Sequence, residues 1–500
     1  MPAKDEKKQV KEGCSTPIAD FLDEYAKKQG VRAHMPGHKG SASGSFASDL
    51  DITEISGADS LYEADGIILE SENNASVLFG TKHSFYVTEG SSQAIKAMCL
   101  LAIRMSQKQA GTGAKKPVII AGRNAHRSFV SAAELLGFEV EWLVGENRAS
   151  LMECRVTPEI LEEKLQEAGF CNEAEGETPE NNAGRMLAGI YITSPDYLGN
   201  MADIKALAEV AHKHGTLLLV DNAHGSYLKF LKKDRHPVTS GADLVCDSAH
   251  KTLPVLTGGA YLHVSKRLKK DFDMTEIRQA LLRFGSTSPS YLILRSLDLA
   301  NAFLGENATE RYFDKCVSRI EPLKRIYVKQ GIVFCGNEPM KISIDLKKSG
   351  FYGESAQAVV KSFREEGIEP EFGDEDYIIL MLSPFNKPED YEKIILALKK
   401  MSIFRALLMD KAADASGRKK NKKQTMDFTL PQKKHEPCEV LRKKREKVKL
   451  KDATSRIAAD VPVSCPPAIL PVIPGEVVDE NIIKILKYYG IKEIYVEKSI

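Results

Sequence analysis

The sequence predicts an α/β protein in which a large domain with a mostly parallel sheet is followed by a smaller α/β domain. From residue 83 onward, short apolar runs alternate with longer amphipathic segments, which is the pattern of successive strand–helix units. The run Leu217–Val220 is apolar throughout, as expected for a strand that is buried on both faces of a parallel sheet. The same alternation begins again at Lys341, and this restart indicates the second domain.

Composition limits the function classes. The 500 residues are 43% hydrophobic, which is enough for a large core and a second domain, and the formal net charge of +1 gives no reason to expect nucleic acid as a partner. No apolar run is long enough to span a bilayer, and the N-terminus lacks the apolar core of a signal peptide. Nine cysteines without a CxxC pair are typical of reduced thiols. We therefore expect a cytoplasmic protein without a membrane partner, and we find no metal-ligand cluster.

The chain divides into five expected segments. They are an N-terminal helix with a polar loop (residues 1–40), a major domain (41–310), a small α/β domain (311–408), a basic insertion (409–456) and the C-terminal part of the small domain (457–500). The stretch 411–451 is rich in Lys and Arg and poor in apolar residues, so we interpret it as solvated and mobile. Residues 171–184 are acidic and rich in Asn, which favours a surface insertion.

Helix and strand signals place the individual elements. Thr16-Pro17 begins a helix with a capping hydroxyl and a proline at its first position, and Gly30 ends it. In the major domain we expect strands at 83–87, 117–121, 187–193, 217–220 and 244–246, and helices after residue 93, over 202–214 and through residue 297. In the remainder we expect strands 342–346 and 377–382 and helices 355–366, 388–401 and 479–489.

One lysine stands directly after a strand end. The apolar run Leu244–Cys246 leads into Asp-Ser248-Ala-His250-Lys251. Open α/β sheets bind ligands beyond the carboxyl ends of their strands. A lysine there, beside a histidine and after Ser248, is typical of a Schiff-base nucleophile next to a phosphate-binding hydroxyl, although a solvated loop lysine has the same local sequence.

Other strand ends carry groups of complementary chemistry. Asp221 follows the apolar strand 217–220, so its carboxylate is partly desolvated and requires a cation or a donor. Gly90-Ser91-Ser92 stands at a strand-to-helix turn, where backbone N–H groups, hydroxyls and the helix dipole attract an anion. His126 follows another strand, and Ser286-Thr287-Ser288 precedes a long helix. Each signal alone is also compatible with an ordinary capped turn or loop.

Together, these groups match the chemistry of pyridoxal 5′-phosphate. Lys251 would form the Schiff base, and Asp221 would keep the pyridine nitrogen protonated so that the ring accepts electrons. Ser248 and the glycine–serine turn would hold the phosphate. His126 would stack on one face of the ring, and the small Ala223 would pack on the other.

A set of motifs spread over most of the chain points to one known family. The motifs are MPGHKG (35–40), DITEISGADSL (51–61), TEGSSQ (88–93), RNAHRS (123–128), SPDYLG (194–199), VDNAHG (220–225), DSAHKTLPVLTGGAYLH (247–263), STSPSYLILRSLD (286–298) and PGE (474–476). With them, the chain resembles the fold-type-I, pyridoxal-phosphate-dependent ornithine/lysine/arginine decarboxylases. The histidine before Lys251 is the most discriminating feature, since related aminotransferases usually have another residue there.

The resemblance implies which residues act. The catalytic residues would be Lys251, His250, Asp221 and His126. The cofactor-binding residues would be Gly90, Ser91, Ser92, His126, Asp221, Ala223, His224, Ser248, Lys251, Ser286 and Thr287. The distal cationic group of the substrate needs an acidic partner, for which Glu54 and Asp59 in the DITEISGADSL loop are the candidates.

The resemblance also implies the activity and the assembly. The expected reaction removes carbon dioxide from arginine, lysine or ornithine and leaves the corresponding amine, with His250 or the freed Lys251 returning a proton to Cα. A phosphate contact from the neighbouring subunit would fall in Ser286–Ser288, which implies a homodimer or higher homo-oligomer with shared active sites. Because the MPGHKG motif begins at Met35, we expect the short form of the family, without an N-terminal wing domain.

One departure and two alternatives remain open. The family's C-terminal Tyr-Pro-Pro-Gly-Ile-Pro segment is Cys465-Pro-Pro-Ala-Ile-Leu470 here, which leaves its packing and the substrate specificity open. The alternatives are another fold-type-I reaction, transamination or β-elimination, and a catalytically inactive binding protein that uses the basic 411–451 stretch. His250 and the PGHKG and STSPSY motifs favour the decarboxylase, and the basic stretch lacks the interleaved aromatic residues typical of nucleic-acid binding.

Overall fold

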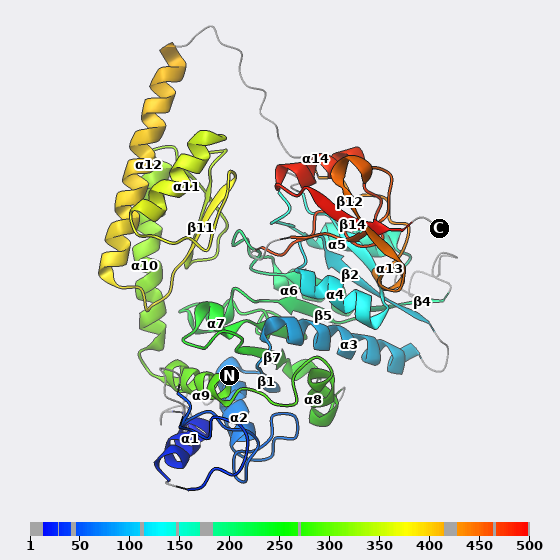
Figure 1. Ribbon diagram of the computed structural model, residues 1–500, viewed down its shortest axis with the longest axis vertical. Coiled ribbons are helices and arrows are strands. Elements are labelled where there is room, and N and C mark those ends of the chain that lie inside the picture. Colours follow the sequence, from blue (N-terminus) through cyan, green and yellow to red (C-terminus); the bar gives the residue numbers. More distant parts are fainter. Residues whose placement is uncertain are drawn as a thin grey trace, which may run out of the picture.

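The computed structural model describes residues 14–28, 30–41, 47–110, 115–146, 150–170, 184–268, 272–414, 428–463 and 467–498. A large sheet with helices on both faces lies at the centre, a smaller α/β domain stands beside it and a C-terminal unit packs on helix α4 (Figure 1). No helix in these ranges is long and apolar enough to cross a membrane. The surface insertion predicted over 171–184 lies almost wholly outside the described residues.

The large sheet has seven strands in the order β1-β7-β6-β5-β4-β2-β3. All run parallel except β7, which is antiparallel to both of its neighbours, so the predicted mostly parallel sheet is confirmed. The strands are β1 (His83–Val87), β2 (Lys116–Gly122), β3 (Glu139–Leu143), β4 (Arg185–Thr193), β5 (Leu218–Asp221), β6 (Leu244–Asp247) and β7 (Ala260–Val264). Each of the five strands predicted for this domain is present.

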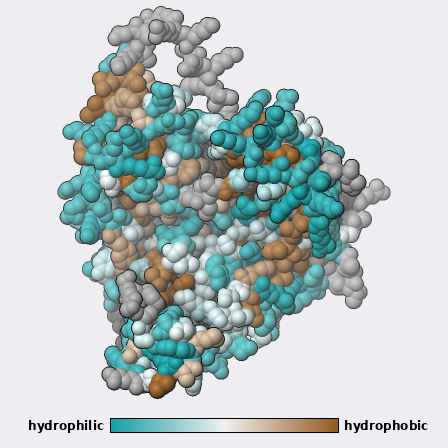
Figure 2. Space-filling model, viewed as in Figure 1, coloured by the Kyte–Doolittle hydropathy of each residue, from teal (hydrophilic) through white to brown (hydrophobic). Residues whose placement is uncertain are grey.

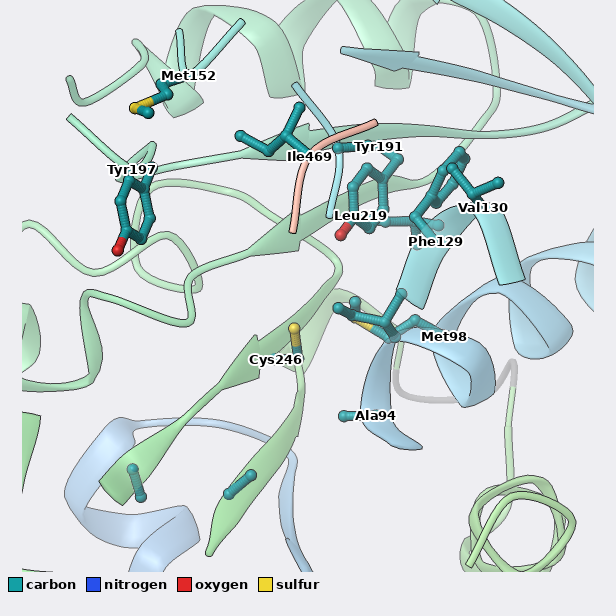
Figure 3. Close-up of a cluster of buried hydrophobic side chains, with 14 of the residues drawn as sticks. Ala94, Met98, Phe129, Val130, Met152, Tyr191, Tyr197, Leu219, Cys246 and Ile469 are labelled. Carbon is teal, nitrogen blue, oxygen red and sulfur yellow. The ribbon is translucent and has the colours of Figure 1, made fainter. Parts of the chain in front are cut away.

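Side chains alternate between the two faces of this sheet because successive strand residues point to opposite sides. Tyr191 and Leu219 pack in a core with Met98 and Phe129 from the helices on one face, and Figure 3 shows this core. Ile192, next to Tyr191, packs in a second core on the other face. The helices of the first face are α3 (Gly90–Ala110) and α4 (Arg127–Leu136), and those of the second are α5 (Pro158–Glu167) and α6 (Ile204–Lys213).

The N-terminal helices lie beyond the β1 end of the sheet (Figure 1). The predicted first helix is present, but Thr16 makes no side-chain capping bond; the carboxylate of Asp298 instead accepts hydrogen bonds from the backbone N–H groups of Ile18 and Ala19. Sequence could not indicate this cap because Asp298 is distant in the chain. The remaining helices of the domain are α1 (Pro17–Lys27), α2 (Ile67–Phe79), α7 (Ala249–Thr252), α8 (Met274–Leu282) and α9 (Tyr291–Gly305).

The small domain contains a four-stranded sheet in the order β10-β11-β9-β8. Its strands pair antiparallel throughout, and they are β8 (Val333–Cys335), β9 (Lys341–Asp345), β10 (Phe372–Gly373) and β11 (Tyr377–Met381). Its helices are α10 (Thr309–Val328), α11 (Glu354–Glu365) and α12 (Pro388–Asp414). The strands and helices expected after residue 341 are therefore found, and α12 extends further than its predicted end.

The C-terminal unit is a separate three-stranded sheet in the order β12-β14-β13. Its elements are α13 (Pro437–Leu441), β12 (Arg445–Lys449), β13 (Ala458–Asp460), α14 (Glu480–Tyr488) and β14 (Glu493–Glu497). Helix α13 packs on α4 of the major domain. The C-terminal segment thus forms its own sheet and does not extend the sheet of the small domain.

The structure corrects the interpretation of the basic stretch 411–451 as a solvated, mobile insertion. Its N-terminal residues continue α12, and residues 428–451 are part of the C-terminal unit, so the expected solvated insertion is wrong for these residues; residues 415–427 lie outside the described part. The composition misled because β12 is an edge strand, which carries Arg445, Lys447 and Lys449 on its exposed face and turns Val448 inward. Lysines on an edge strand also prevent pairing with other chains. Hydrophilic side chains accordingly cover much of this unit (Figure 2).

Candidate active site

Polar side chains from several strand ends meet at the carboxyl edge of the large sheet and line one cavity of about 130 Å³. This is where parallel sheets bind their ligands. The lining residues are Ser91, Asn124, His126, Thr193, Tyr197, Asp221, Ala223, His224, Lys251, Glu371, Pro467 and Ile469. Glu371 comes from the small domain, and Pro467 and Ile469 come from the C-terminal segment, so all three parts of the chain contribute to the cavity.

Lys251 reaches this cavity from the short helix α7, which directly follows β6. Its Nζ lies 3.1 Å from Nε2 of His224, which stands in the loop after β5. Burial, followed by the charge of Lys251, lowers the pKa of the neighbouring His250. The backbone N–H of His250 bonds to the carbonyl of Gly259, which fixes the start of α7 against the turn before β7. Of the sequence-predicted histidine–lysine pair, Lys251 therefore lines the cavity, whereas His250 stands beside it in the chain and does not line the cavity.

Asp221 ends β5 and is almost fully buried. Its Oδ2 accepts a hydrogen bond from the hydroxyl of Tyr191 at 2.9 Å, and its Oδ1 accepts one from the backbone N–H of Ala223 at 3.1 Å. Burial, reinforced by the Asp221 charge, raises the pKa of the Tyr191 hydroxyl well above its ordinary value, so Tyr191 remains a donor. Among the described residues, no Lys or Arg forms an ion pair with Asp221. A buried carboxylate of this kind favours a cationic group in the cavity beside it.

Hydroxyl groups converge at the N-terminus of α3, where free backbone N–H groups and the helix dipole favour an anion. The Oγ atoms of Ser91 and Ser248 lie 2.8 Å apart, and those of Ser92 and Ser128 lie 2.7 Å apart. Gly90 has a φ of 69°, a left-handed conformation that glycine adopts without strain, and the space above its Cα is open. This end of the cavity can therefore hold a phosphate.

His126 is the N-terminal cap of α4. Its Nδ1 accepts a hydrogen bond from the backbone N–H of Ser128 at 3.1 Å, so the ring proton is on Nε2. Burial is the main cause of the lowered pKa of His126; the charge of Asp221 acts in the opposite direction. A neutral imidazole lining the cavity is suited to lie against an aromatic ring.

The residues of the cavity fit pyridoxal 5′-phosphate. Two buried polar atoms that line it, Nδ2 of Asn124 and Oγ1 of Thr193, have no hydrogen-bond partner within the described chain. Buried polar atoms normally have partners, so these two favour a polar ligand. The hydroxyl groups at the N-terminus of α3 match the phosphate of the cofactor. Lys251 matches its aldehyde, and the carboxylate of Asp221 matches its pyridine nitrogen.

Four of the site residues predicted from the sequence lie away from the cavity in the same chain. Ser286 and Thr287 are exposed in the loop between α8 and α9, and Glu54 is exposed near the N-terminal helices. Asp59 has a structural task, because its carboxylate accepts hydrogen bonds from backbone N–H groups at the start of α2, including those of Gly66 and Ile68. None of the four lines the cavity, and neither do the candidates Gly90, Ser92, Ser248 and His250, which lie next to the lining residues Ser91 and Lys251.

Sequence reasoning missed two residues of the small domain, one of which lines the cavity while the other contacts a lining residue. Glu371 is 120 residues beyond Lys251 in the chain, and its Oε1 accepts a hydrogen bond from the hydroxyl of Tyr197 at 3.3 Å. Lys341, at the start of β9, contacts His224 from the small domain. Tyr197 lies within the SPDYLG motif. Of these three residues, it is the one that a sequence motif marks.

A strap of C-terminal residues, 467–471, closes one side of the cavity. Ile469 pairs with His126 in an isolated β-bridge, and the backbone N–H of Arg127 donates to the carbonyl of Ala468 at 2.9 Å. The buried guanidinium of Arg123 donates to the carbonyls of Leu470 and Pro471 and pairs with Glu476 at 3.1 Å. Because removal of one partner would leave a buried charge, this pair holds the strap firmly on the major domain.

Replacing Ala468 with glycine should stabilise the protein. Ala468 has a φ of 53°, and it stands where the family's Tyr-Pro-Pro-Gly-Ile-Pro segment has glycine. Relief of left-handed strain exceeds the entropy that glycine costs, so we expect a gain of up to about 1 kcal/mol and a melting temperature higher by about 1–2 °C by calorimetry. Ala459→Gly in β13, where φ is not left-handed, is the control and should lower the melting temperature. Equal shifts in the two variants would contradict the interpretation.

A buried cluster of Asp247, His236 and His263 lies next to the strands that carry the site residues. Oδ2 of Asp247 lies 3.0 Å from Nε2 of His236 and 3.3 Å from Nε2 of His263. Among the described residues, this is the group whose side chains are spaced closely enough to bind a metal ion. Their contacts are accounted for as hydrogen bonds, since Nδ1 of each histidine also has a partner. Oδ1 of Asp247 accepts a bond from Asn222, the residue after Asp221. The cluster thus fixes the ends of β5 and β6, which carry the aspartate and the lysine.

Solved structures share this fold. They include the Francisella novicida lysine decarboxylase LdcF, with a TM-score of 0.75 and 17% identity over 97% of this chain and 81% of that one, and the E. coli constitutive lysine decarboxylase, with a TM-score of 0.71 and 17% identity over 97% and 82%. The fold is that of the fold-type-I enzymes, as predicted.

The family follows from the sequence match. Residues 16–343 match the Orn/Lys/Arg decarboxylase major domain, and residues 419–497 match the C-terminal domain of the same family. The chain therefore belongs to the Orn/Lys/Arg decarboxylase family, and the resemblance is confirmed. It is 28% identical over 500 residues to an arginine decarboxylase of Bacillus subtilis, covering 94% of this chain and 93% of that one, and 29% identical over 389 residues to the uncharacterized protein YaaO of B. subtilis, covering 74% of each.

Proposed function

We propose that this carboxy-lyase holds pyridoxal 5′-phosphate on Lys251 and decarboxylates arginine, lysine or ornithine to the corresponding amine. The observation that carries the proposal is the pairing of a cavity-facing lysine with a buried carboxylate that has no cationic partner among the described residues. When bound, the cofactor supplies an electron sink for the bond that releases carbon dioxide. The seven described free cysteines are consistent with a reducing, cytoplasmic setting.

The residues in and next to the cavity have the following roles in this proposal. Asp221 holds a proton on the pyridine nitrogen, and the hydroxyl of Tyr191 holds Asp221 in place. His126 and Ala223, which both line the cavity, would lie against the two faces of the ring. The hydroxyls of Ser91, Ser92 and Ser248 and the backbone at Gly90 bind the phosphate. His250 or the free amine of Lys251 delivers a proton to Cα.

A basic substrate needs an acidic group for its distal cation, and Glu371 is the best candidate in this chain. It lines the cavity together with Lys251, and its Oε1 accepts a hydrogen bond from Tyr197, which lines the same cavity. Glu54 of a neighbouring subunit remains a second candidate because its carboxylate is exposed. Asp59 is the weaker of the original pair, since capping of α2 occupies its carboxylate.

The reaction type is tested with carboxyl-labelled arginine, lysine and ornithine. We expect labelled carbon dioxide and an equal amount of amine from at least one of them, and release that depends on added pyridoxal phosphate. Formation of a keto acid without labelled carbon dioxide would instead assign a transaminase. Glu371→Gln should raise KM for the preferred substrate about tenfold or more, since a hydrogen bond to a charged group is worth about 1.5–3 kcal/mol.

We propose that the exposed Ser286–Ser288 loop contacts the cofactor phosphate in the active site of the neighbouring subunit, so that two subunits share each site. We expect a mixture of Lys251→Ala subunits with subunits carrying alanine at Ser286, Thr287 and Ser288 to recover activity. Half of the dimers are then mixed and each has one complete site, so about a quarter of the wild-type activity should return. Each variant alone is the control and should be nearly inactive. Full activity of the triple variant alone would rule out a contribution of this loop.

A further inference from the structure

A second cavity adjoins the active-site cavity at the strap 467–471. Its volume is about 610 Å³, compared with about 130 Å³ for the active-site cavity. Pro467 and Ile469 line both cavities. At these residues the strap is therefore a wall one residue thick, and the larger space, which we call the outer cavity, begins directly beyond the active site.

The outer cavity is mainly apolar. All three parts of the chain contribute apolar side chains to it, namely Leu151 and Met152 of the major domain, Phe372 of the small domain and Val463 and Ile491 of the C-terminal unit. Lys447, Lys492 and Glu493 line it as well, but Lys447 pairs with Glu493 at 2.7 Å and Lys492 is exposed to solvent. Such a lining favours an aliphatic or aromatic group, because that group leaves water on entering the cavity.

The small domain contributes to both cavities through two successive residues. Glu371 lines the active-site cavity, and Phe372 lines the outer cavity. The ring of Phe372 packs edge to face on the ring of Tyr197, a residue of the active-site cavity, with the ring centres 5.8 Å apart. Because Glu371 is the proposed partner of the substrate's distal cation, the distal end of the substrate would lie close to the place where the two cavities meet.

The side chain of Ile469 fills this wall, and its backbone is held independently. Ile469 is almost fully buried and belongs to the same hydrophobic cluster as Met152 of the outer cavity and Tyr197 of the active-site cavity (Figure 3). Its backbone pairs with His126 in the β-bridge described above. Shortening the side chain should therefore open the wall without displacing the strap.

We propose that Ile469 is a specificity-determining residue whose side chain ends the space available to the distal group of the substrate. It admits a basic amino acid and excludes derivatives that carry an apolar extension, for which the outer cavity has room. The inference rests on the proposed function, since it takes a basic substrate and its contact with Glu371 as given. It assigns a role to the segment Cys465–Leu470, whose effect on specificity the sequence left open.

The test compares each basic amino acid that the enzyme decarboxylates with its derivative butylated at the distal nitrogen. The alkylated nitrogen keeps its positive charge, so the two compounds differ by one apolar group. We expect the wild-type enzyme to favour the parent compound. Ile469→Ala should raise kcat/KM for the derivative relative to the parent about tenfold or more, since a single methylene in an apolar pocket already changes such ratios by about 10–200-fold.

A second readout requires neither cofactor nor turnover. Calorimetric titration of the cofactor-free, full-length protein with the butylated derivative should show binding to Ile469→Ala about tenfold tighter than to the wild type. If circular dichroism shows that Ile469→Ala does not fold, Ile469→Val gives the same comparison with a smaller gain.

Two control variants make the result specific. Ile473→Ala shortens the same type of side chain at a buried position of the C-terminal segment that lines neither cavity, so both readouts should stay at the wild-type values. Ile469→Leu keeps the volume of the side chain and should keep the wild-type selectivity.

Unchanged selectivity of Ile469→Ala would overturn the proposal. So would a wild-type enzyme that uses the derivative as well as the parent compound, or an equal gain in Ile473→Ala, which would mean that any loss of packing relaxes the site. If no basic amino acid is decarboxylated, the proposed function fails, and the titration alone then decides the role of Ile469. In that case tighter binding by Ile469→Ala supports the wall, and equal binding overturns it.

Discussion

Replacing Lys251 with alanine is expected to reduce decarboxylation by about 10⁴-fold or more, because the substitution removes the proposed covalent attachment point of the cofactor and a proposed proton donor. The side chain packs at a cavity and makes one hydrogen-bond contact, to His224, so the fold should persist. Circular dichroism and the melting temperature check that expectation, and carbon dioxide release measures the activity.

The matched control for this variant is Lys266→Ala. Lys266 is an exposed lysine after β7, away from the cavity, and its removal should leave activity unchanged. Activity of Lys251→Ala above about one per cent of wild type would mean that another amine holds the cofactor, because loss of an essential nucleophile leaves far less.

Replacing Asp221 with asparagine should lower activity by about 10²–10³-fold, the usual loss when a preorganised electrostatic group is removed from an active site. The amide cannot hold a proton on the pyridine nitrogen by charge pairing. Its oxygen can still accept from Tyr191 or Ala223, so we expect the free energy of unfolding to fall by no more than about 1–3 kcal/mol.

Tyr191→Phe separates the charge of Asp221 from its packing. It removes the hydrogen bond to Oδ2 and leaves the carboxylate in place, so activity should fall about tenfold or less, the value of one neutral hydrogen bond. Near-normal turnover of Asp221→Asn, or an equal loss in the two variants, would show that the negative charge is not what the reaction requires.

Local patterns predicted the centre of the fold because they express local physics. The apolar strand 217–220 and the polar residues after it place Asp221 at the edge of a sheet, and the same holds for Lys251 after β6. Since parallel strands end at one edge, the sequence order of these groups was enough to bring them together. His126 and Ser91 joined the same cavity for the same reason.

The parts that sequence did not predict depend on contacts between distant segments. Glu371 lines the cavity, and Lys341 contacts His224 of the cavity, only because the small domain lies against the strand ends, and nothing near them in the chain indicates this. Composition predicts a mobile segment where the edge strand β12 lies, because the lysines and arginines of this strand outweigh Val448. The role proposed for Ser286 requires a second subunit, whose position no pattern within one chain predicts.

Borohydride reduction of the pyridoxal-phosphate-loaded protein, followed by peptide mapping, tests whether Lys251 holds the cofactor. We expect one phosphopyridoxyl group per chain, attached to the peptide that contains Lys251, together with loss of the visible absorbance. The Lys251→Ala protein, treated in the same way, should carry none. Attachment to another lysine of the wild-type protein, or an absence of any stable adduct after loading, would contradict it.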